Sequence, residues 1–171
     1  MKYFAAFFVV VVLLATFGCS RQGSASYKDD VKKALEQADL KDVTVSEDVD
    51  KNTITLGGTL HSDEAKARAA DVAHNAAGTR IIANEISVQP LGSESEAKDV
   101  ASNLDDAIEK NYKAALISSH LDKQHIDFKA KNGLLSLTGS VHNRNEKQEA
   151  QKLAGGIPNV QQVVNQIEVR R

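Results

Sequence analysis

Two stretches of the chain carry the same pattern 81 residues apart: ITLGGTLHSDEAKARAADVAHNAAGTRIIANEISV at residues 54–88 and LSLTGSVHNRNEKQEAQKLAGGIPNVQQVVNQIEV at residues 135–169. Aligned without a gap, they are identical at nine of 35 positions. The identical pairs are Leu56/Leu137, Gly58/Gly139, His61/His142, Lys66/Lys147, Ala69/Ala150, Ala73/Ala154, Asn84/Asn165, Ile86/Ile167 and Val88/Val169. Solenoid repeats are shorter, about 20–50 residues. The pattern therefore predicts a duplication that forms two small tandem domains.

Each copy predicts the element order αββαβ. Apolar residues at helical spacing (Val31, Ala34, Leu35 and Ala38) predict a first helix, and alternating apolar residues predict strands with one buried face. The fold class is therefore α+β, with two helices packed on one face of a small mixed sheet in each domain. The expected elements are the helices near 31–38 and 65–76, strands near 43–45, 54–60 and 82–88, and in the second copy helices near 104–121 and 146–154 and strands near 126–128, 135–141 and 163–169.

The order Leu-x-Gly-x-(Val/Leu), a charged helix and Val-x-Asn-x-Ile-x-Val resembles the BON domain, a family named for bacterial osmotically inducible and nodulation proteins. Residues 27–89 and 98–171 would each form one such domain, and residues 90–97, with a proline, a glycine and two serines, would link them. The resemblance implies a non-enzymatic protein of the bacterial periplasm or outer membrane. It also implies phospholipid contact and a role in envelope integrity under osmotic stress.

The N-terminal residues predict a cleaved leader. Lys2 precedes an uncharged apolar run that ends at Gly18, which is shorter than the roughly 20 residues needed to span a bilayer. The run followed by Cys19 resembles a bacterial lipoprotein signal, which implies a signal peptide at 1–18, lipid on Cys19 and a polar tether at 19–26. Ser20 after the cysteine favours the outer membrane by the same resemblance. The alternative is an uncleaved membrane anchor with a free or buried cysteine.

Composition excludes several function classes. The 171 residues carry a net charge of −2, which argues against a dedicated nucleic-acid binder. A single cysteine excludes an internal disulfide and a multi-cysteine zinc site, and only three of the eight aromatic residues lie outside the leader. Residues 27–90 hold 8 basic and 12 acidic side chains, whereas residues 97–171 hold 11 basic and 9 acidic ones. The second domain is therefore the better partner for an anionic surface.

Most of the glycine, asparagine and histidine residues that stand out in the repeat have structural explanations. Gly58 and Gly139 follow a strand residue, and we expect each to mark a bulge or a helix packed closely over the strand. Asn84 and Asn165 alternate with apolar residues, so we expect them to satisfy a turn or a neighbouring backbone group. The paired His61 and His142, and the loop with His120 and His125, offer only weak ligand spacing. We expect no metal, no cofactor and no catalytic residues.

The strongest candidate for a binding surface is the first helix of the second domain, wound over residues 104–121. Its sheet-facing side would carry Leu104, Ile108, Tyr112 and Ala115. Lys110, Lys113, Ile117 and, if the helix extends so far, Leu121 would face outward as the phospholipid contact, with Asp106 on the same face. Apolar residues beside lysines suit a helix that lies at a lipid surface.

These observations support two hypotheses of different classes. The first is an outer-membrane lipoprotein facing the periplasm whose domains bind anionic phospholipid or envelope components. The alternative is a periplasmic stress protein that holds protein clients, or an oligomeric structural module. Lipid binding should weaken with salt and require anionic headgroups, whereas client binding should depend neither on salt nor on anionic headgroups.

Overall fold

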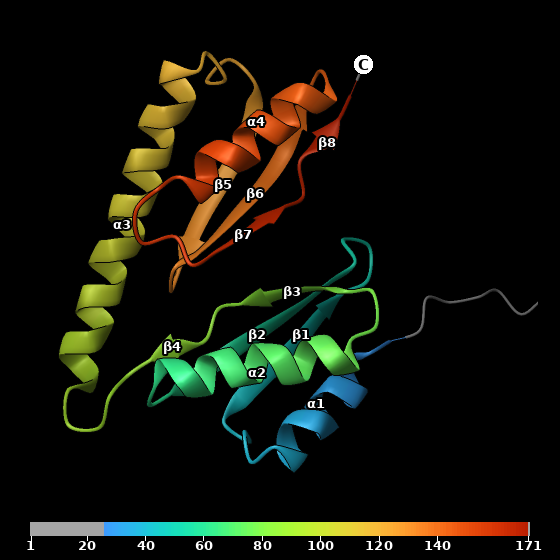
Figure 1. Cartoon of the computed structure of the whole chain (residues 1–171), viewed down its shortest axis with the longest axis vertical. Coiled ribbons are helices and arrows are strands. Elements are labelled where there is room, and N and C mark those ends of the chain that lie inside the picture. Colours follow the sequence, from blue (N-terminus) through green and yellow to red (C-terminus); the bar gives the residue numbers. More distant parts are fainter. Residues whose placement is uncertain (1–25, 171) are drawn as a thin grey trace, which may run out of the picture.

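The structure, a computed structural model, describes residues 26–170. The first domain contains α1 (Lys28–Gln37), β1 (Val43–Asp48), β2 (Thr53–Leu60), α2 (Asp63–Ala76), β3 (Ile81–Asn84) and β4 (Ser87–Val88). Strand β2 lies at the centre of the sheet, with β1 antiparallel on one side and β3 and β4 parallel on the other. Both helices pack on one face of this sheet (Figure 1).

The second domain repeats this arrangement. It contains α3 (Glu94–Ser118), β5 (His125–Lys131), β6 (Leu134–Val141), α4 (Arg144–Gly155), β7 (Gln162–Asn165) and β8 (Glu168–Val169). Strand β6 pairs antiparallel with β5 and parallel with β7 and β8. The predicted α+β class, with two tandem αββαβ units and mixed sheets, is confirmed.

Each domain buries its own apolar core. One cluster draws all its buried residues from 31–86 and the other from 108–167. Alternate residues of the central strands supply much of each core, for example Ile54 and Leu56 in β2 and Leu135 and Leu137 in β6. The buried faces of the second helices carry alanines at their centre, which lets those helices approach the sheet closely.

The expected closing strand of each domain is broken in two by its asparagine. Asn84 Oδ1 accepts from the Ile86 amide at 3.3 Å, and Asn84 Nδ2 donates to the Lys66 carbonyl at 3.0 Å. Asn165 makes the equivalent bonds, accepting from the amide two residues on and donating to Lys147 O at 3.2 Å. An asparagine side chain that bonds its own backbone two residues on makes a turn. The chain thus leaves the sheet briefly between β3 and β4 and between β7 and β8.

Gly58 and Gly139 lie where a strand approaches its neighbour too closely for a side chain. Their φ angles are +102° and +95°. A Cβ would collide with the Asp42 carbonyl oxygen at Gly58 and with the His125 carbonyl oxygen at Gly139. The close neighbour is therefore the backbone of the adjacent strand, and the packed helix offered as one explanation is wrong.

Helix α3 begins earlier and ends earlier than the expected helix over 104–121. It starts at Glu94, so the last four residues of the proposed 90–97 linker are helical. It ends at Ser118 because His120 takes a positive φ of 58°. The Leu121 amide then donates to Leu116 O and the His120 amide to Ile117 O, which is the Schellman pattern of a helix end.

A second contact joins the two domains besides the chain itself. Strands β3 and β7, the edges of their sheets, lie next to each other (Figure 1). The Gln162 amide spans the gap, because its Nε2 donates to Ile82 O at 2.6 Å and its Oε1 accepts from the Asn84 amide at 3.2 Å. Three apolar side chains are buried between the domains: Ala83, Leu134 and Val164. We call this contact the seam.

The turn between β5 and β6 completes the seam. Lys66 Nζ donates to the Asn132 carbonyl at 2.6 Å, and Asn132 Nδ2 donates to Glu85 O at 2.8 Å. Lys131 forms an ion pair with Glu85 at 2.7 Å. Asp105 of α3 holds the same turn by accepting from the Asn132 amide at 2.7 Å. The turn therefore ties α3 of the second domain to α2 and the β3–β4 junction of the first.

Candidate functional site

The outward face of α3 carries three of the predicted contact residues. Lys110, Lys113 and Ile117 are all exposed, and 53% of the Ile117 surface is accessible. The opposite side of the helix buries Ile108, Tyr112 and Leu116 against the second sheet. The outward face therefore combines two ammonium groups with one large apolar side chain, and the exposed Asp106 adds a negative charge one turn before Lys110.

Leu121 does not belong to this surface. It is 6% exposed and lies in the core of the second domain. The turn at His120 carries the chain back under the helix, and in a Schellman ending the residue after the turn packs on the last helical turn. Leu40, which follows Asp39 at φ 60°, is buried in the same way in the first domain. This equivalence was the sequence signal that could have placed Leu121 in the core.

Leu104 also differs from its expected place. It was assigned to the sheet-facing side, but it is 40% exposed. The first turns of α3 run beyond the second sheet toward β4 of the first domain, so there is no sheet of their own domain beneath them. Val100, one turn earlier, is 57% exposed. This second apolar strip was not predicted, because the expected helix began at residue 104.

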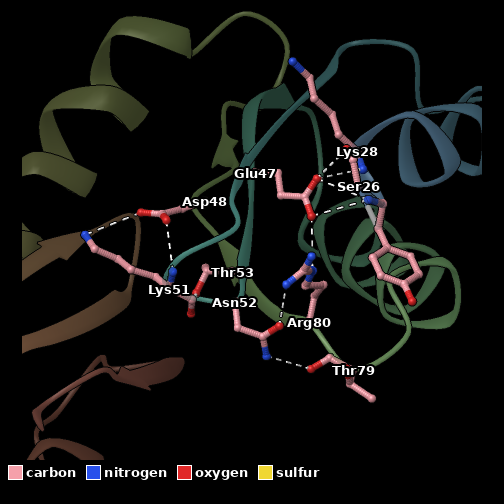
Figure 2. Close-up of polar contacts among 10 residues, drawn as sticks. Ser26, Lys28, Glu47, Asp48, Lys51, Asn52, Thr53, Thr79 and Arg80 are labelled. Carbon is pink, nitrogen blue, oxygen red and sulfur yellow. Dashed lines mark hydrogen bonds and ion pairs between the residues drawn. The ribbon is translucent and has the colours of Figure 1, made fainter. Parts of the chain in front are cut away.

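The N-terminal end of the described chain is held by a nearly buried carboxylate (Figure 2). Glu47 Oε2 accepts from the Ser26 hydroxyl at 2.7 Å and from the Lys28 amide at 3.3 Å. Its Oε1 lies 3.1 Å from Arg80 Nε, and the two side chains are 4% and 7% exposed. The Arg80 guanidinium lies 5.5 Å from the centre of the Tyr27 ring. Glu47 thus fixes the place where the predicted tether joins the fold.

The surroundings of Glu47 favour its ionised form. The Ser26 hydroxyl bond, followed by the backbone amides of Tyr27 and Lys28 and the charge of Arg80, lowers the pKa of Glu47 against the opposing effect of burial. Tyr27, the residue before α1, contributes no side-chain cap, so the carboxylate is what faces the first amides of that helix. A negative charge at a helix N-terminus is stabilising. The ion pair of Glu47 and Arg80 was not predicted from the sequence, because its members are 33 residues apart.

The histidines do not converge on a metal site. His61 Nδ1 lies 2.9 Å from the Gln89 carbonyl, and His142 is exposed near Glu146. His120 occupies the turn after α3 and His125 begins β5. Within residues 26–170 no group of three or more histidine, cysteine, aspartate or glutamate side chains could hold a metal ion.

A groove of about 840 Å³ lies along the seam. Its walls come from α2, β3 and β7, and it mixes apolar side chains such as Ile82 and Val163 with Lys66 and His74. Burial lowers the pKa of Lys66, which stands between this groove and a smaller hollow of about 240 Å³ beside α3.

The leader and its cysteine lie outside the described residues, so the predictions for 1–18, Cys19 and most of the tether stay predictions. Between residues 26 and 170, none of the helices combines the length and the apolar character needed to cross a bilayer.

The duplicated fold defines the class of the protein. The BON domain family matches residues 25–90 and 104–171. The chain therefore belongs to the BON domain family, as the motifs around the two glycines and the two asparagines indicated. It is similar to osmotically-inducible protein Y of Escherichia coli (strain K12), with 25% identity over 142 residues that cover 82% of this chain and 69% of that protein.

Two solved structures of CdsD, a structural protein of the type III secretion system of Chlamydia trachomatis, also match. Each is 14% identical with a TM-score of 0.35. The matches cover 81% and 84% of this chain but 62% and 61% of those chains, so this chain spans less than two thirds of them.

Proposed function

We propose that this chain is a non-enzymatic lipoprotein of the bacterial cell envelope that supports envelope integrity under osmotic stress by binding anionic phospholipid. Its membership of the BON domain family and its similarity to an osmotically inducible protein support the envelope and osmotic role.

The outward face of α3 carries the lipid contact. Its two lysines are exposed, and Ile117 stands beside them with half of its surface accessible. In a helix that lies at a lipid surface, the apolar side chain enters between headgroups while the ammonium groups meet phosphates. The first domain offers no equal surface, because the large apolar residues of α1, Val31 and Leu35, are buried.

Sedimentation with vesicles tests this proposal. Residues 20–171 contain both cores, so this soluble form would be mixed with vesicles of neutral lipid or of neutral and anionic lipid. We expect binding to anionic vesicles that weakens as salt is raised from about 0.05 to 0.5 M, because salt screens exposed charges. Lys110→Glu with Lys113→Glu should weaken binding about thirtyfold, from about 1 kcal/mol per lysine.

The chain offers a matched control for charge. Lys32 and Lys33 are exposed on α1, so Lys32→Glu with Lys33→Glu makes the same change in net charge away from the outward face of α3. The control pair should bind nearly as the unchanged chain does. Equal losses in the two double variants would mean that net charge alone governs binding, and unchanged binding in the α3 variant would remove this helix as the contact.

Cys19 supplies the anchor in this proposal. Cys19→Ser should stop incorporation of labelled palmitate and release the protein from the membrane fraction of cells. Incorporation that persists in the variant would contradict the anchor, while vesicle binding by α3 would remain a separate result.

The groove along the seam favours one second candidate, the holding of an unfolded protein client. An extended apolar segment could lie on its apolar wall, which includes Ile82 and Val163. Suppression of aggregation of a denatured test protein, insensitive to salt and to Lys110→Glu with Lys113→Glu, would favour this candidate over lipid binding.

A further inference from the structure

Some contacts across the seam recur between equivalent positions of the two domains, as they would around an approximate two-fold axis. Residues 81 positions apart are equivalent, and the equivalents Ala83 and Val164 pack together at its centre. Glu85 contacts the turn before β6, and its equivalent Gln166 donates to Thr53 Oγ1 at 2.6 Å at the start of β2. Contacts that are exchanged in this way are typical of the isologous interface of a symmetric dimer.

Gln162 breaks the symmetry of the seam. Its amide bonds the backbone of β3 at Ile82 and Asn84, in the way a neighbouring strand would. The equivalent position in the first domain is Ile81, whose side chain has no hydrogen-bonding group. The second domain therefore holds the edge of the first, and the first does not return that bond.

The second domain also possesses the groups that the first domain presents to Gln162 and to the β5–β6 turn, except that Gln166 and Leu134 replace the Glu85 carboxylate and the Thr53 hydroxyl. Val163 and Asn165 are equivalent to Ile82 and Asn84, the backbone acceptor and donor of the Gln162 amide. Lys147 is equivalent to Lys66, the donor to the Asn132 carbonyl. Two copies of the second domain would thus form the Gln162 and lysine contacts twice, where the intact chain forms each once.

We infer that the β7 edge of the second domain is a self-complementary surface that pairs with the same edge of a second copy of this chain once the first domain is displaced from it. The surface is continuous with the seam, and an unpaired strand edge is a template for pairing. Val164 and Leu134 of each copy would fill the centre, as they do with Ala83 in the seam. The first domain cannot pair with itself in this way, because Ile81 cannot supply the two amide bonds.

Two equivalent substitutions test the inference. Ala83 and Val164 belong to the seam cluster and to neither domain core, so Ala83→Asp and Val164→Asp should each open the seam and leave both domains folded. Ala83→Asp leaves the second domain intact and should convert residues 20–171 from a monomer into a dimer in sedimentation equilibrium at about 10–100 µM. Val164→Asp places the charge on the β7 edge itself and should remain a monomer.

Gln162 provides the decisive second variant. Adding Gln162→Ala to Ala83→Asp removes four hydrogen bonds from the dimer, two from each copy, and should raise its dissociation constant about a hundredfold. A second way to open the seam is Glu85→Lys, which sets a lysine against Lys131 without placing a charge in a buried position. This variant should dimerise as Ala83→Asp does and covers the case in which Ala83→Asp does not fold.

Circular dichroism shows whether each variant is folded. If Ala83→Asp and Glu85→Lys are both folded and both remain monomers at the highest concentration, the inference is overturned. Dimerisation that is equal in Val164→Asp, or that is unchanged by Gln162→Ala, would also overturn it, because another surface would then be responsible.

Discussion

At Gly58 and Gly139 a single missing side chain allows two strands to pair. Both residues have positive φ, and a Cβ at either would meet a carbonyl oxygen at the start of the neighbouring strand, that of Asp42 or of His125. Their identity in both copies of the repeat therefore reflects the backbone of the sheet and needs no ligand to explain it.

Alanine at either glycine should destabilise its domain by about 2 kcal/mol or more, because the strained φ and the collision add together. Urea unfolding measures the change. Gly155→Ala is the control, since a Cβ there has nothing within 4 Å and lies in α4, where alanine is favoured over glycine by up to about 1 kcal/mol. If Gly58→Ala had the same stability as the unchanged chain, the strand approach would be looser than the structure has it.

Glu47 makes the stability of the first domain dependent on pH. Its pKa is lowered in the folded state, so its contribution is complete above the ordinary glutamate value of about 4.3 and is lost as pH falls through the lower folded value. We expect Glu47→Gln to lower the unfolding midpoint at pH 7, and we expect this deficit to shrink as pH falls toward 3. Thermal unfolding of both forms between these values measures this convergence. If Glu47→Gln lowered the unfolding midpoint equally at pH 7 and at pH 3, the loss would come from packing and not from the charge of Glu47.

Among the elements, α3 shows how a helix end decides the role of a side chain. Ile117 and Leu121 were both expected on the outward face, but the turn at His120 leaves the first exposed and buries the second. Hydrophobicity and helical spacing alone do not distinguish them.

The two residues should therefore respond differently to the same substitution. Leu121→Ser should cost about 3 kcal/mol of unfolding free energy, because it removes a buried side chain and leaves a polar group in its place. Ile117→Ser should change stability by less than about 0.5 kcal/mol and alter only vesicle binding. Denaturant unfolding with circular dichroism gives both values, and a large loss in Ile117→Ser would mean that this residue is packed against the protein.

For the whole molecule, the seam couples two domains that have separate cores. Because each core is built from one domain alone, the pieces 26–90 and 94–171 should each fold. Each should be less stable alone than in the intact chain by about 2 kcal/mol, since several hydrogen bonds and a small apolar cluster are lost. Hydrogen exchange of the β2 amides, compared between the piece 26–90 and the intact chain, measures this difference. Identical protection would mean that the seam contributes nothing.

The repeat at 54–88 and 135–169 predicted the duplication, and the apolar patterns at 31–45 and 104–128 added the first helix and strand of each unit. Period-2 and helical spacing of apolar residues depend on local geometry, so they can be read without knowing what lies opposite. The tandem family assignment followed from the same residues. The start of α3 at Glu94 was harder to predict, because a segment with proline, glycine and serine has the composition of a linker.

Tertiary structure alone decided the contacts between residues far apart in the chain. Glu47 and Arg80 form their ion pair because β1 and the segment before β3 lie together, and Gln162 reaches β3 because the two sheet edges meet. Such pairings depend on how elements pack, and packing energy is summed over the whole molecule, so a local pattern does not contain it. The sequence determined two BON domains and their cores, whereas the seam, the burial of Leu121 and the exposure of Leu104 were decided by the fold.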